Sequence, residues 1–386
     1  MARIVYGLSG EGSGHSSRSQ QMARYLVAQG HEVKLASYDR GYRNLKEEFD
    51  MLEIEGLTIA NENNKVSKSK TLAANLGKLS AGLKTFRRLK KSLFEEFQPD
   101  VVITDFEPMT AYLAYTNDLP LITIDNQHRM RYMQYDGPAH LNTDRRLTKG
   151  VIRAMVPRPD VSLVITFYEA PATNRRTLFF PPILRDEVLA IQPTEGDHIL
   201  VYLSFGFDDF IEQLKQFPNE TFRVYGYDRE AQDGNLHYRP FSKEGFMNDL
   251  ASSKAVMATA GFTLMSEALW LKKPMLALPM AGQFEQQLNG HCLEQMGLGK
   301  NASEPTREAV GDFLYRLPEY RAALAQKRPA TTRRSSINWM NSSPTTELWP
   351  ASFTPTVRPM PRRKLDEPQG CSRSTMPCPS ASPIRK

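Results

Sequence analysis

Residues 10–18 are Gly10-Glu11-Gly12-Ser13-Gly14-His15-Ser16-Ser17-Arg18, and they follow the apolar run Ile4-Val5-Tyr6. About 250 residues later, Thr259-Ala260-Gly261-Phe262-Thr263-Leu264-Met265-Ser266-Glu267 follows Ala255-Val256-Met257. Each stretch predicts a strand, a turn of small residues and the start of a helix. Such a turn directs free backbone N–H groups and the positive end of a helix dipole at whatever lies above it. Two such turns indicate two α/β domains that face each other across a cleft.

The remaining strand signals support two domains of the same kind. In the first half, mostly apolar runs predict strands at Arg3–Tyr6, Glu32–Ser37, Val101–Thr104, Leu119–Ile124 and, as the last one, Val161–Thr166. In the second half, the predicted strands are His198–Ser204, Phe222–Tyr225, Ala255–Met257 and Met275–Leu278. The double proline in Phe179-Phe180-Pro181-Pro182 predicts a linker that runs to about Asp197. We therefore expect an α/β fold with two Rossmann-like, doubly wound domains, at 1–182 and 183–327.

Composition separates the last part of the chain from the rest. The net charge is +6, but residues 328–386 alone carry ten Lys/Arg against three Asp/Glu, so residues 1–327 carry about −1. Ten of the 26 prolines also lie in 328–386, without hydrophobic periodicity. This segment is either a disordered tail or translation in a wrong reading frame, and we expect no catalytic role for it. The basic pI is therefore no evidence for a nucleic-acid partner.

Other features of the sequence concern location. The chain has 386 residues and 40% hydrophobic content, and no apolar run approaches the roughly 18 residues that span a bilayer. We see no secretion signal at the start. The three cysteines, Cys292, Cys371 and Cys378, form neither a disulfide framework nor a metal cluster. We expect a cytoplasmic protein, with a peripheral location on the inner face of the membrane as an alternative.

The first glycine loop carries a histidine. The loop lacks the lysine of a P-loop, which argues against nucleoside triphosphate hydrolysis, and its G-x-G-x-G spacing supports a dinucleotide site poorly. His15 stands where the loop becomes a helix, and a neutral imidazole there is able to take a proton from a hydroxyl nucleophile. The alternative is a histidine that caps the helix or bonds a carbonyl. Both interpretations stay open.

The second half carries the clearest likeness to a known family. The ordered matches are Ala260-Gly261-Phe262-Thr263, Ser266-Glu267-Ala268, Lys273-Pro274-Met275 and Glu285-Gln286-Gln287-Leu288-Asn289-Gly290. They resemble the donor-binding signature of UDP-glycosyltransferases and of the lipid II-forming N-acetylglucosaminyltransferase family. Together with Gly10–Arg18, they make residues 1 to about 325 similar to nucleotide-sugar glycosyltransferases of the GT-B fold.

The resemblance implies a role for each matching residue. The diphosphate would be held by Gly12, Gly14, Gly261 and Thr263 with their helix N-termini, and approached by the Ser-x-Gly turn of Ser204 and Gly206. Glu267 would bind ribose hydroxyls, and Glu285 and Gln286, supported by Asn289, would hold hexose hydroxyls. Asp105 would orient His15 as the catalytic base. From its position alone, Asp105 is equally well a helix N-cap ahead of Pro108, and His128, after the strand at 121–124, is a rival base.

Residues 65–92 form a basic segment. They hold nine Lys/Arg and no Asp/Glu, and Leu72, Leu76, Leu79, Leu83 and Phe86 recur at three- and four-residue steps. This pattern predicts an amphipathic helix or helix pair. Its apolar stripe faces either the protein core, with a solvated basic face, or an anionic membrane that presents a lipid-linked acceptor.

We therefore expect a hexosyltransferase that uses a nucleoside-diphosphate sugar, UDP-linked, and a hydroxyl acceptor such as a lipid or cell-envelope glycan. We expect no cofactor and no bound metal, because the sequence has no Asp-x-Asp motif. Two alternatives remain, a nucleotide-sugar epimerase of the same fold and a non-catalytic nucleotide-sugar-binding module.

Overall fold

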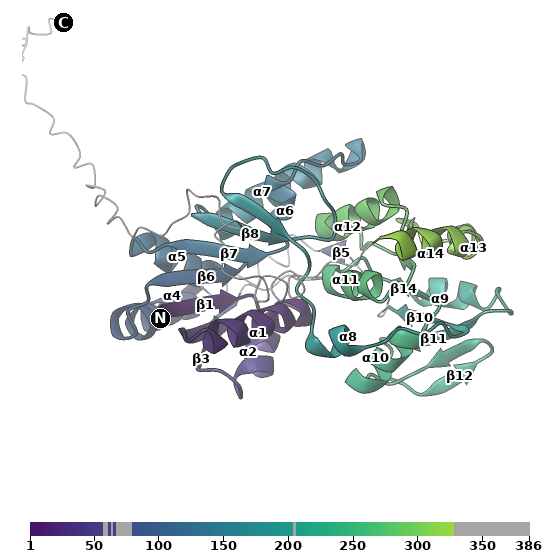
Figure 1. Ribbon diagram of the computed structural model, residues 1–386, viewed down its shortest axis with the longest axis horizontal. Coiled ribbons are helices and arrows are strands. Elements are labelled where there is room, and N and C mark those ends of the chain that lie inside the picture. The colour runs from purple at the N-terminus through teal and green to yellow at the C-terminus, as the bar shows by residue number, and fades with distance from the viewer. Residues whose placement is uncertain (57–60, 63–64, 67–78, 204–205, 328–386) are drawn as a thin grey trace, which may run out of the picture. The chain divides into compact units, whose positions relative to one another are not determined.

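A computed structural model describes residues 1–56, 61–62, 65–66, 79–203 and 206–327 (Figure 1). Ser204, most of the segment 65–78 and the whole of 328–386 lie outside these residues, so the predictions made for them remain predictions. Within the described residues the strands form two seven-stranded sheets and one two-stranded sheet. The small sheet is the antiparallel pair β4 (Asn61–Glu62) and β5 (Lys65–Val66).

The first sheet has the strand order β3-β2-β1-β6-β7-β8-β9, and every pairing in it is parallel. Its strands are β1 (Arg3–Leu8), β2 (Glu32–Ser37), β3 (Met51–Glu53), β6 (Val101–Asp105), β7 (Leu121–Asp125), β8 (Val161–Ile165) and β9 (Thr177–Phe180). The helices that connect them are α1 (Ser13–Ala28), α2 (Asp39–Leu45), α4 (Leu79–Leu89), α5 (Pro108–Thr116), α6 (Arg129–Tyr132) and α7 (Asn142–Met155). Between α4 and β6 lies a π-helical segment (Lys90–Glu96), and before α7 a 3₁₀ turn (Ala139–Leu141). The order reverses direction between β1 and β6, which is where doubly wound sheets place their ligands.

The second sheet has the order β12-β13-β11-β10-β14-β15-β16 and is parallel except for β12. Its strands are β10 (His198–Tyr202), β11 (Thr221–Tyr225), β12 (Ala231–Asp233), β13 (Leu236–Tyr238), β14 (Ala255–Ala258), β15 (Met275–Ala277) and β16 (Gly299–Asn301). The helices of this half are α8 (Asp186–Ala190), α9 (Asp208–Leu214), α10 (Lys243–Ser252), α11 (Phe262–Trp270), α12 (Phe284–Gln295), α13 (Arg307–Tyr315) and α14 (Leu317–Gln326). Here the order reverses between β10 and β14.

Both faces of each sheet are covered by apolar side chains. Neighbouring residues of β1 enter different cores: Val5 belongs to one cluster, and Ile4 and Tyr6 belong to another. In β10, Leu200 packs on the opposite face from Ile199 and Val201. Successive side chains of a strand point to opposite faces, so strands buried on both sides are apolar without interruption. This explains why the sequence predicted β1, β6, β10 and β14 as short, mostly apolar runs.

One predicted boundary is wrong. The strand at 161–166 is not the last of the first sheet, because β9 pairs with β8 in parallel, with Val164 opposite Phe179. Phe179 and Phe180, predicted to lie in the linker, are thus strand residues. The strand has only four residues and ends directly at Pro181-Pro182, so the prolines hid a short strand ahead of them.

The described part of the basic segment turns apolar side chains inward. Leu89, at the end of α4, and Leu93, in the π-helical segment, are fully buried in the first core, while Lys84, Arg87 and Lys91 are exposed. From residue 84 onward the helix therefore has the core-facing stripe and solvated basic face of the first alternative. The side chains of residues 65–83 lie outside the description.

Candidate active site

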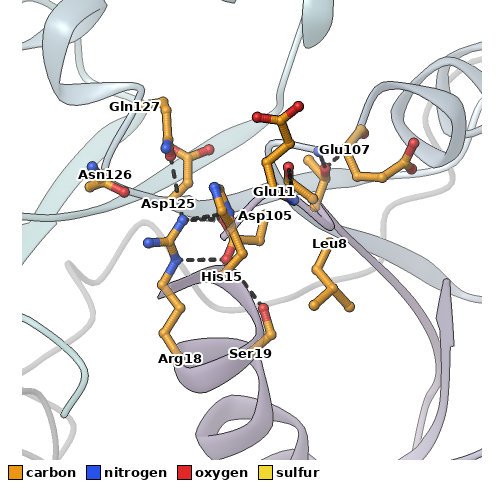
Figure 2. Close-up of polar contacts among 12 residues, drawn as sticks. Leu8, Glu11, His15, Arg18, Ser19, Asp105, Glu107, Asp125, Asn126 and Gln127 are labelled. Atoms are coloured by element: carbon orange, nitrogen blue, oxygen red, sulfur yellow. Dashed lines mark hydrogen bonds and ion pairs between the residues drawn. The ribbon is translucent and has the colours of Figure 1, made fainter. Parts of the chain in front are cut away.

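His15 and Asp105 meet where the first sheet reverses direction. Leu8 and Asp105 are paired at the carboxyl ends of β1 and β6, and α1 starts five residues after Leu8. His15 lies in the first turn of α1, with its Nδ1 atom 2.9 Å from Oδ1 of Asp105 (Figure 2). The side chain of His15 is 12% exposed and that of Asp105 is fully buried. The carboxylate is therefore enclosed, and the imidazole retains contact with the outside.

Two more side chains of α1 hold the same carboxylate. Arg18 donates from Nε to Oδ2 and from Nη2 to Oδ1 of Asp105, both at 2.6 Å, and Ser19 donates to Oδ2 at 3.2 Å (Figure 2). Burial by itself raises the pKa of Asp105, but the charges of Arg18 and His15 and their hydrogen bonds outweigh burial and lower that pKa to about 2. Asp105 is thus an anion at neutral pH, with both oxygens occupied.

The alternative roles for these two residues do not match the structure. The N-cap of α5 is Glu107, not Asp105, and its carboxylate accepts from the N–H groups of Met109 and Thr110 at 2.7 and 2.8 Å. Burial raises the pKa of Glu107. His15 does not cap α1 either, because the N-cap is Gly12. The carboxylate of Asp105 does not cap α5; it contacts the side chains of His15, Arg18 and Ser19.

The rival histidine is enclosed. His128 is fully buried, and its Nδ1 lies 2.7 Å from Oδ2 of Asp125, the last residue of β7. Its ring stacks on Tyr132, and its Nε2 atom is buried without a hydrogen-bond partner among the described residues. His15 is therefore the more accessible of the two histidines, although both form a pair with an aspartate.

The two glycine loops approach each other at their helix starts. A Cβ atom on Gly14 would lie 2.4 Å from Oγ1 of Thr263, so a side chain there would force Thr263 to shift, and the first turn of α1 passes close to the first turn of α11. Gly12 has φ 72° and ψ 175°, a conformation that other residues rarely adopt. Neither α1 nor α11 has a side-chain cap, and the N-cap of α11, Gly261, has open space where a side chain would stand. Two positive helix ends thus converge with their first N–H groups uncapped by side chains.

The predicted Ser-x-Gly turn at residues 204–206 is described only in part. Gly206 has φ 99°, and its N–H donates to Oδ2 of Asp208 at 3.1 Å, in the turn that starts α9. Ser204 lies outside the described residues. A phosphate role for either residue remains a prediction.

Glu267 has a partner that the sequence did not suggest. Its carboxylate is 2% exposed and accepts from Nε and Nη2 of Arg185, both at 2.9 Å. Burial raises the pKa of Glu267, against the lowering effect of Arg185. Each carboxylate oxygen has a second lone pair, so contact with ribose hydroxyls remains a prediction, and it would be made by a carboxylate whose position Arg185 fixes.

Glu285, one of the two predicted hexose-binding residues, contacts the loop after β7. Glu285, at the start of α12, accepts from the side-chain amides of Asn126 at 2.6 Å and Gln127 at 3.4 Å. Gln127 in turn accepts from Arg18 at 3.5 Å. Glu285 is thereby connected to the His15–Asp105 pair through two intermediate side chains.

The other two residues of this motif bond the backbone. Gln286 accepts through Oε1 from the N–H of Met280 at 3.0 Å. Asn289 donates to the carbonyl of Ala260, directly before the N-cap of α11, at 2.8 Å. Asn289 therefore supports the glycine loop, while the sugar contacts of Glu285 and Gln286 remain predictions.

Across the described ranges, no group of three or more His, Cys, Asp or Glu side chains is arranged to hold a metal ion. No helix in the described part of the chain is both long and apolar enough to cross a bilayer.

Comparison with known proteins decides the family. The sequence model of the family described as "Glycosyl transferase family 1" matches residues 2–318. The chain belongs to this family. The match includes both glycine loops, the His15–Asp105 pair and the Glu285–Asn289 motif, so the glycosyltransferase family covers all of the site described above.

Relatives and solved structures agree with this family. An uncharacterized glycosyltransferase of Methanosarcina acetivorans is 28% identical over 362 residues, covering 81% of this chain and 91% of the relative. Another, of Methanosarcina mazei, is 27% identical over 370 residues and likewise covers 81% of this chain and 91% of the relative. Among solved structures, the glycotransferase of kitacinnamycin has a TM-score of 0.62 at 17% identity, covering 88% of this chain and 98% of its own. The calicheamicin glycosyltransferase CalG4 has a TM-score of 0.59 at 15% identity, with the same coverage. The predicted GT-B type of α/β fold is confirmed, and the glycosyltransferase has two parallel-dominated sheets.

Sequence reasoning missed the cations of the site. Arg18 and Ser19 lie three and four residues after His15, so helical periodicity places all three on one face of α1, and this signal was available. Arg185 lies in the predicted linker, 82 residues from Glu267, and no local pattern indicates that pair.

Proposed function

We propose that this glycosyltransferase moves a hexose from a nucleoside-diphosphate sugar, UDP-linked, to a hydroxyl group. The observation that carries the proposal is the convergence of the α1 and α11 N-termini at Gly14 and Thr263. Each helix start contributes about half a positive charge and free N–H donors, which together suit a diphosphate. These donors would stabilise the negative charge that develops on the departing diphosphate. One solved structure of similar fold, the glycosyltransferase VinC (TM-score 0.56, 15% identity), is a complex with dTDP, which supports a nucleotide ligand of this class.

We propose His15 as the base for the acceptor. A hydroxyl is a poor nucleophile at neutral pH, so transfer to the sugar carbon requires removal of its proton. Nδ1 of His15 lies near both Asp105 and Nη2 of Arg18, at 2.9 and 2.7 Å, so two tautomers compete. Only the tautomer with its proton on Nδ1 donates to Asp105 and leaves Nε2 free to accept a proton. Asp105 would then stabilise the imidazolium formed during transfer.

We propose a lipid-linked or cell-envelope glycan as the acceptor and a peripheral association with anionic membranes. The exposed basic residues of α4 and of the segment that follows it support such a contact. We also propose that the reaction proceeds without a bound metal, since the helix N-termini supply positive charge at the diphosphate and the sequence has no Asp-x-Asp motif.

The test is a transfer assay with a panel of radiolabelled nucleotide sugars and a membrane lipid extract, with and without EDTA. We expect labelled lipid product from a UDP-sugar and free UDP in equal amount, in both conditions. Isomerisation of the donor without transfer would indicate an epimerase. Binding without turnover would indicate a nucleotide-sugar-binding module.

A further inference from the structure

Arg129 is a fully buried cation that the reactions above do not use. It is the first residue of α6, four residues after the end of β7, and its side chain is among the largest in the protein with no exposure. Its guanidinium lies over the rings of Phe167 and Phe262, with centroid distances of 5.5 and 5.9 Å. These two rings stack on each other at 5.5 Å.

The guanidinium is incompletely satisfied. Nη2 donates to Oδ1 of Asn289, but Nε and Nη1 are buried without a hydrogen-bond partner in the described part of the chain. No carboxylate among the described residues forms a salt bridge with Arg129, whereas buried Arg18 has Asp105. A buried charge without a counter-ion is costly, and aromatic faces offset only part of that cost. Such a group is commonly found where a charged ligand completes the site.

The neighbours of Arg129 indicate which kind of charged ligand would complete the site. Phe262, one of its two aromatic contacts, is the first residue of α11. Asn289, its hydrogen-bond partner, also bonds the carbonyl of Ala260, directly before the N-cap Gly261. The unpaired guanidinium therefore lies against the same uncapped helix start that converges with α1. An anion held there by backbone N–H groups would find its missing cation in Arg129.

We propose that Arg129 binds the diphosphate of the donor, as a cation supplied by the first half of the chain to a site built on the second. This inference rests on the proposed function, because it takes the helix starts to be the diphosphate site. Since the guanidinium is fully buried in this structure, binding requires the side chains around it to move, while Nη2 is able to keep its bond to Asn289. A planar guanidinium with unpaired N–H groups on Nε and Nη1 suits phosphate oxygens better than an ammonium does.

The alternative is a purely structural role, in which Arg129 only joins the loop after β7 to α12. The two roles differ in what they do to ligands. A structural residue would affect nucleoside and nucleoside diphosphate alike. A diphosphate-binding residue would affect only the ligand that carries phosphates.

Calorimetric titration of UDP and uridine separates these roles, with Arg129→Gln, Arg129→Lys and the wild-type protein. We expect Arg129→Gln to weaken UDP binding about tenfold or more, with uridine binding changed less than about twofold, and Arg129→Lys to retain part of the UDP affinity. Arg146→Gln removes the same charge from an exposed position on α7 and serves as the control, with UDP affinity unchanged.

Each other outcome has a definite meaning. Equal weakening of UDP and uridine, or unchanged UDP affinity in Arg129→Gln, would overturn the inference and leave the proposed function intact. If the wild-type protein binds none of UDP, dTDP and GDP, the proposed function falls and the inference falls with it. If Arg129→Gln does not fold, Arg129→Lys decides: a loss of UDP affinity with uridine affinity retained supports the inference, and parallel losses overturn it.

Discussion

Arg18 and Asp105 form a bidentate, buried ion pair at 2.6 Å, and His15 shares the same carboxylate. The pair has two consequences for the base. It fixes the carboxylate in position and keeps it ionised, so that His15 has a constant hydrogen-bond acceptor. The carboxylate of Asp105 also interacts with two groups at once, the guanidinium of Arg18 and the imidazole of His15, unlike the carboxylate of a simple His–Asp pair.

The ion pair should be important for folding. We expect Arg18→Met to lower the free energy of unfolding by about 3–5 kcal/mol, because it leaves the buried carboxylate of Asp105 without its main cation. Arg24→Met, on the same helix, is the control: Arg24 also forms two bonds to one carboxylate, Glu48, but at the surface, and its loss should cost at most about 1 kcal/mol. Urea unfolding measures both, and similar losses in the two variants would contradict this prediction.

Protonation of Asp105 should lower the free energy of unfolding at acid pH. Its pKa is about 2 in the folded protein, against 3.8 for an ordinary aspartate, so the folded state favours the ionised form. The resulting stability, about 2–3 kcal/mol, is present above about pH 4 and is lost as the pH falls towards 2. Urea unfolding of the wild-type protein and of Asp105→Asn, from pH 5 downward, should show a shallower decline in the variant. If the free energy of unfolding declined equally in the wild-type protein and in Asp105→Asn, the folded state would not favour ionised Asp105.

Glu267 should matter for the nucleoside. We expect Glu267→Gln to weaken UDP binding by about 1–3 kcal/mol, the scale for hydrogen bonds to a charged group. The change keeps the shape of the side chain beside Arg185. Glu187→Gln, a half-exposed carboxylate paired with Lys243, is the control and should leave UDP affinity unchanged. Unchanged affinity in Glu267→Gln, measured by calorimetry, would confine Glu267 to its contact with Arg185.

The basic face of α4 and the following segment should bind anionic liposomes weakly and in a salt-sensitive manner. Neutralising Lys84, Arg87, Lys90 and Lys91 should reduce liposome flotation; Arg88 is kept because it donates to the carbonyl of Glu53. A control variant neutralises four exposed basic residues of the second half, namely Arg229, Lys243, Arg307 and Lys327. Equal flotation of the two variants would show that the basic face is only solvated.

The sequence predicted the fold well where strands are buried on both sides, since β1, β6, β10 and β14 are short apolar runs followed by small or polar residues. It missed short strands that lack a buried apolar run of their own, such as β9, which ends at two prolines, and β12, whose three residues are all exposed. For the site, it placed His15 and Asp105 at strand ends that the topology then brought together. Arg185 and Arg129 were beyond its reach, because their partners lie 82 and 160 residues away, and only tertiary packing decides such contacts.

The most direct test of the central claim is the turnover of His15→Ala in the transfer assay, with UDP affinity measured in the same samples. We expect turnover to fall by about 10²–10⁴-fold, the usual contribution of a general base, while UDP affinity stays within about twofold of the wild-type value. Asp105→Asn should lower turnover less. Near-normal turnover of His15→Ala with a hydroxyl acceptor would contradict the claim, and a large loss in His128→Ala instead would make His128 the base.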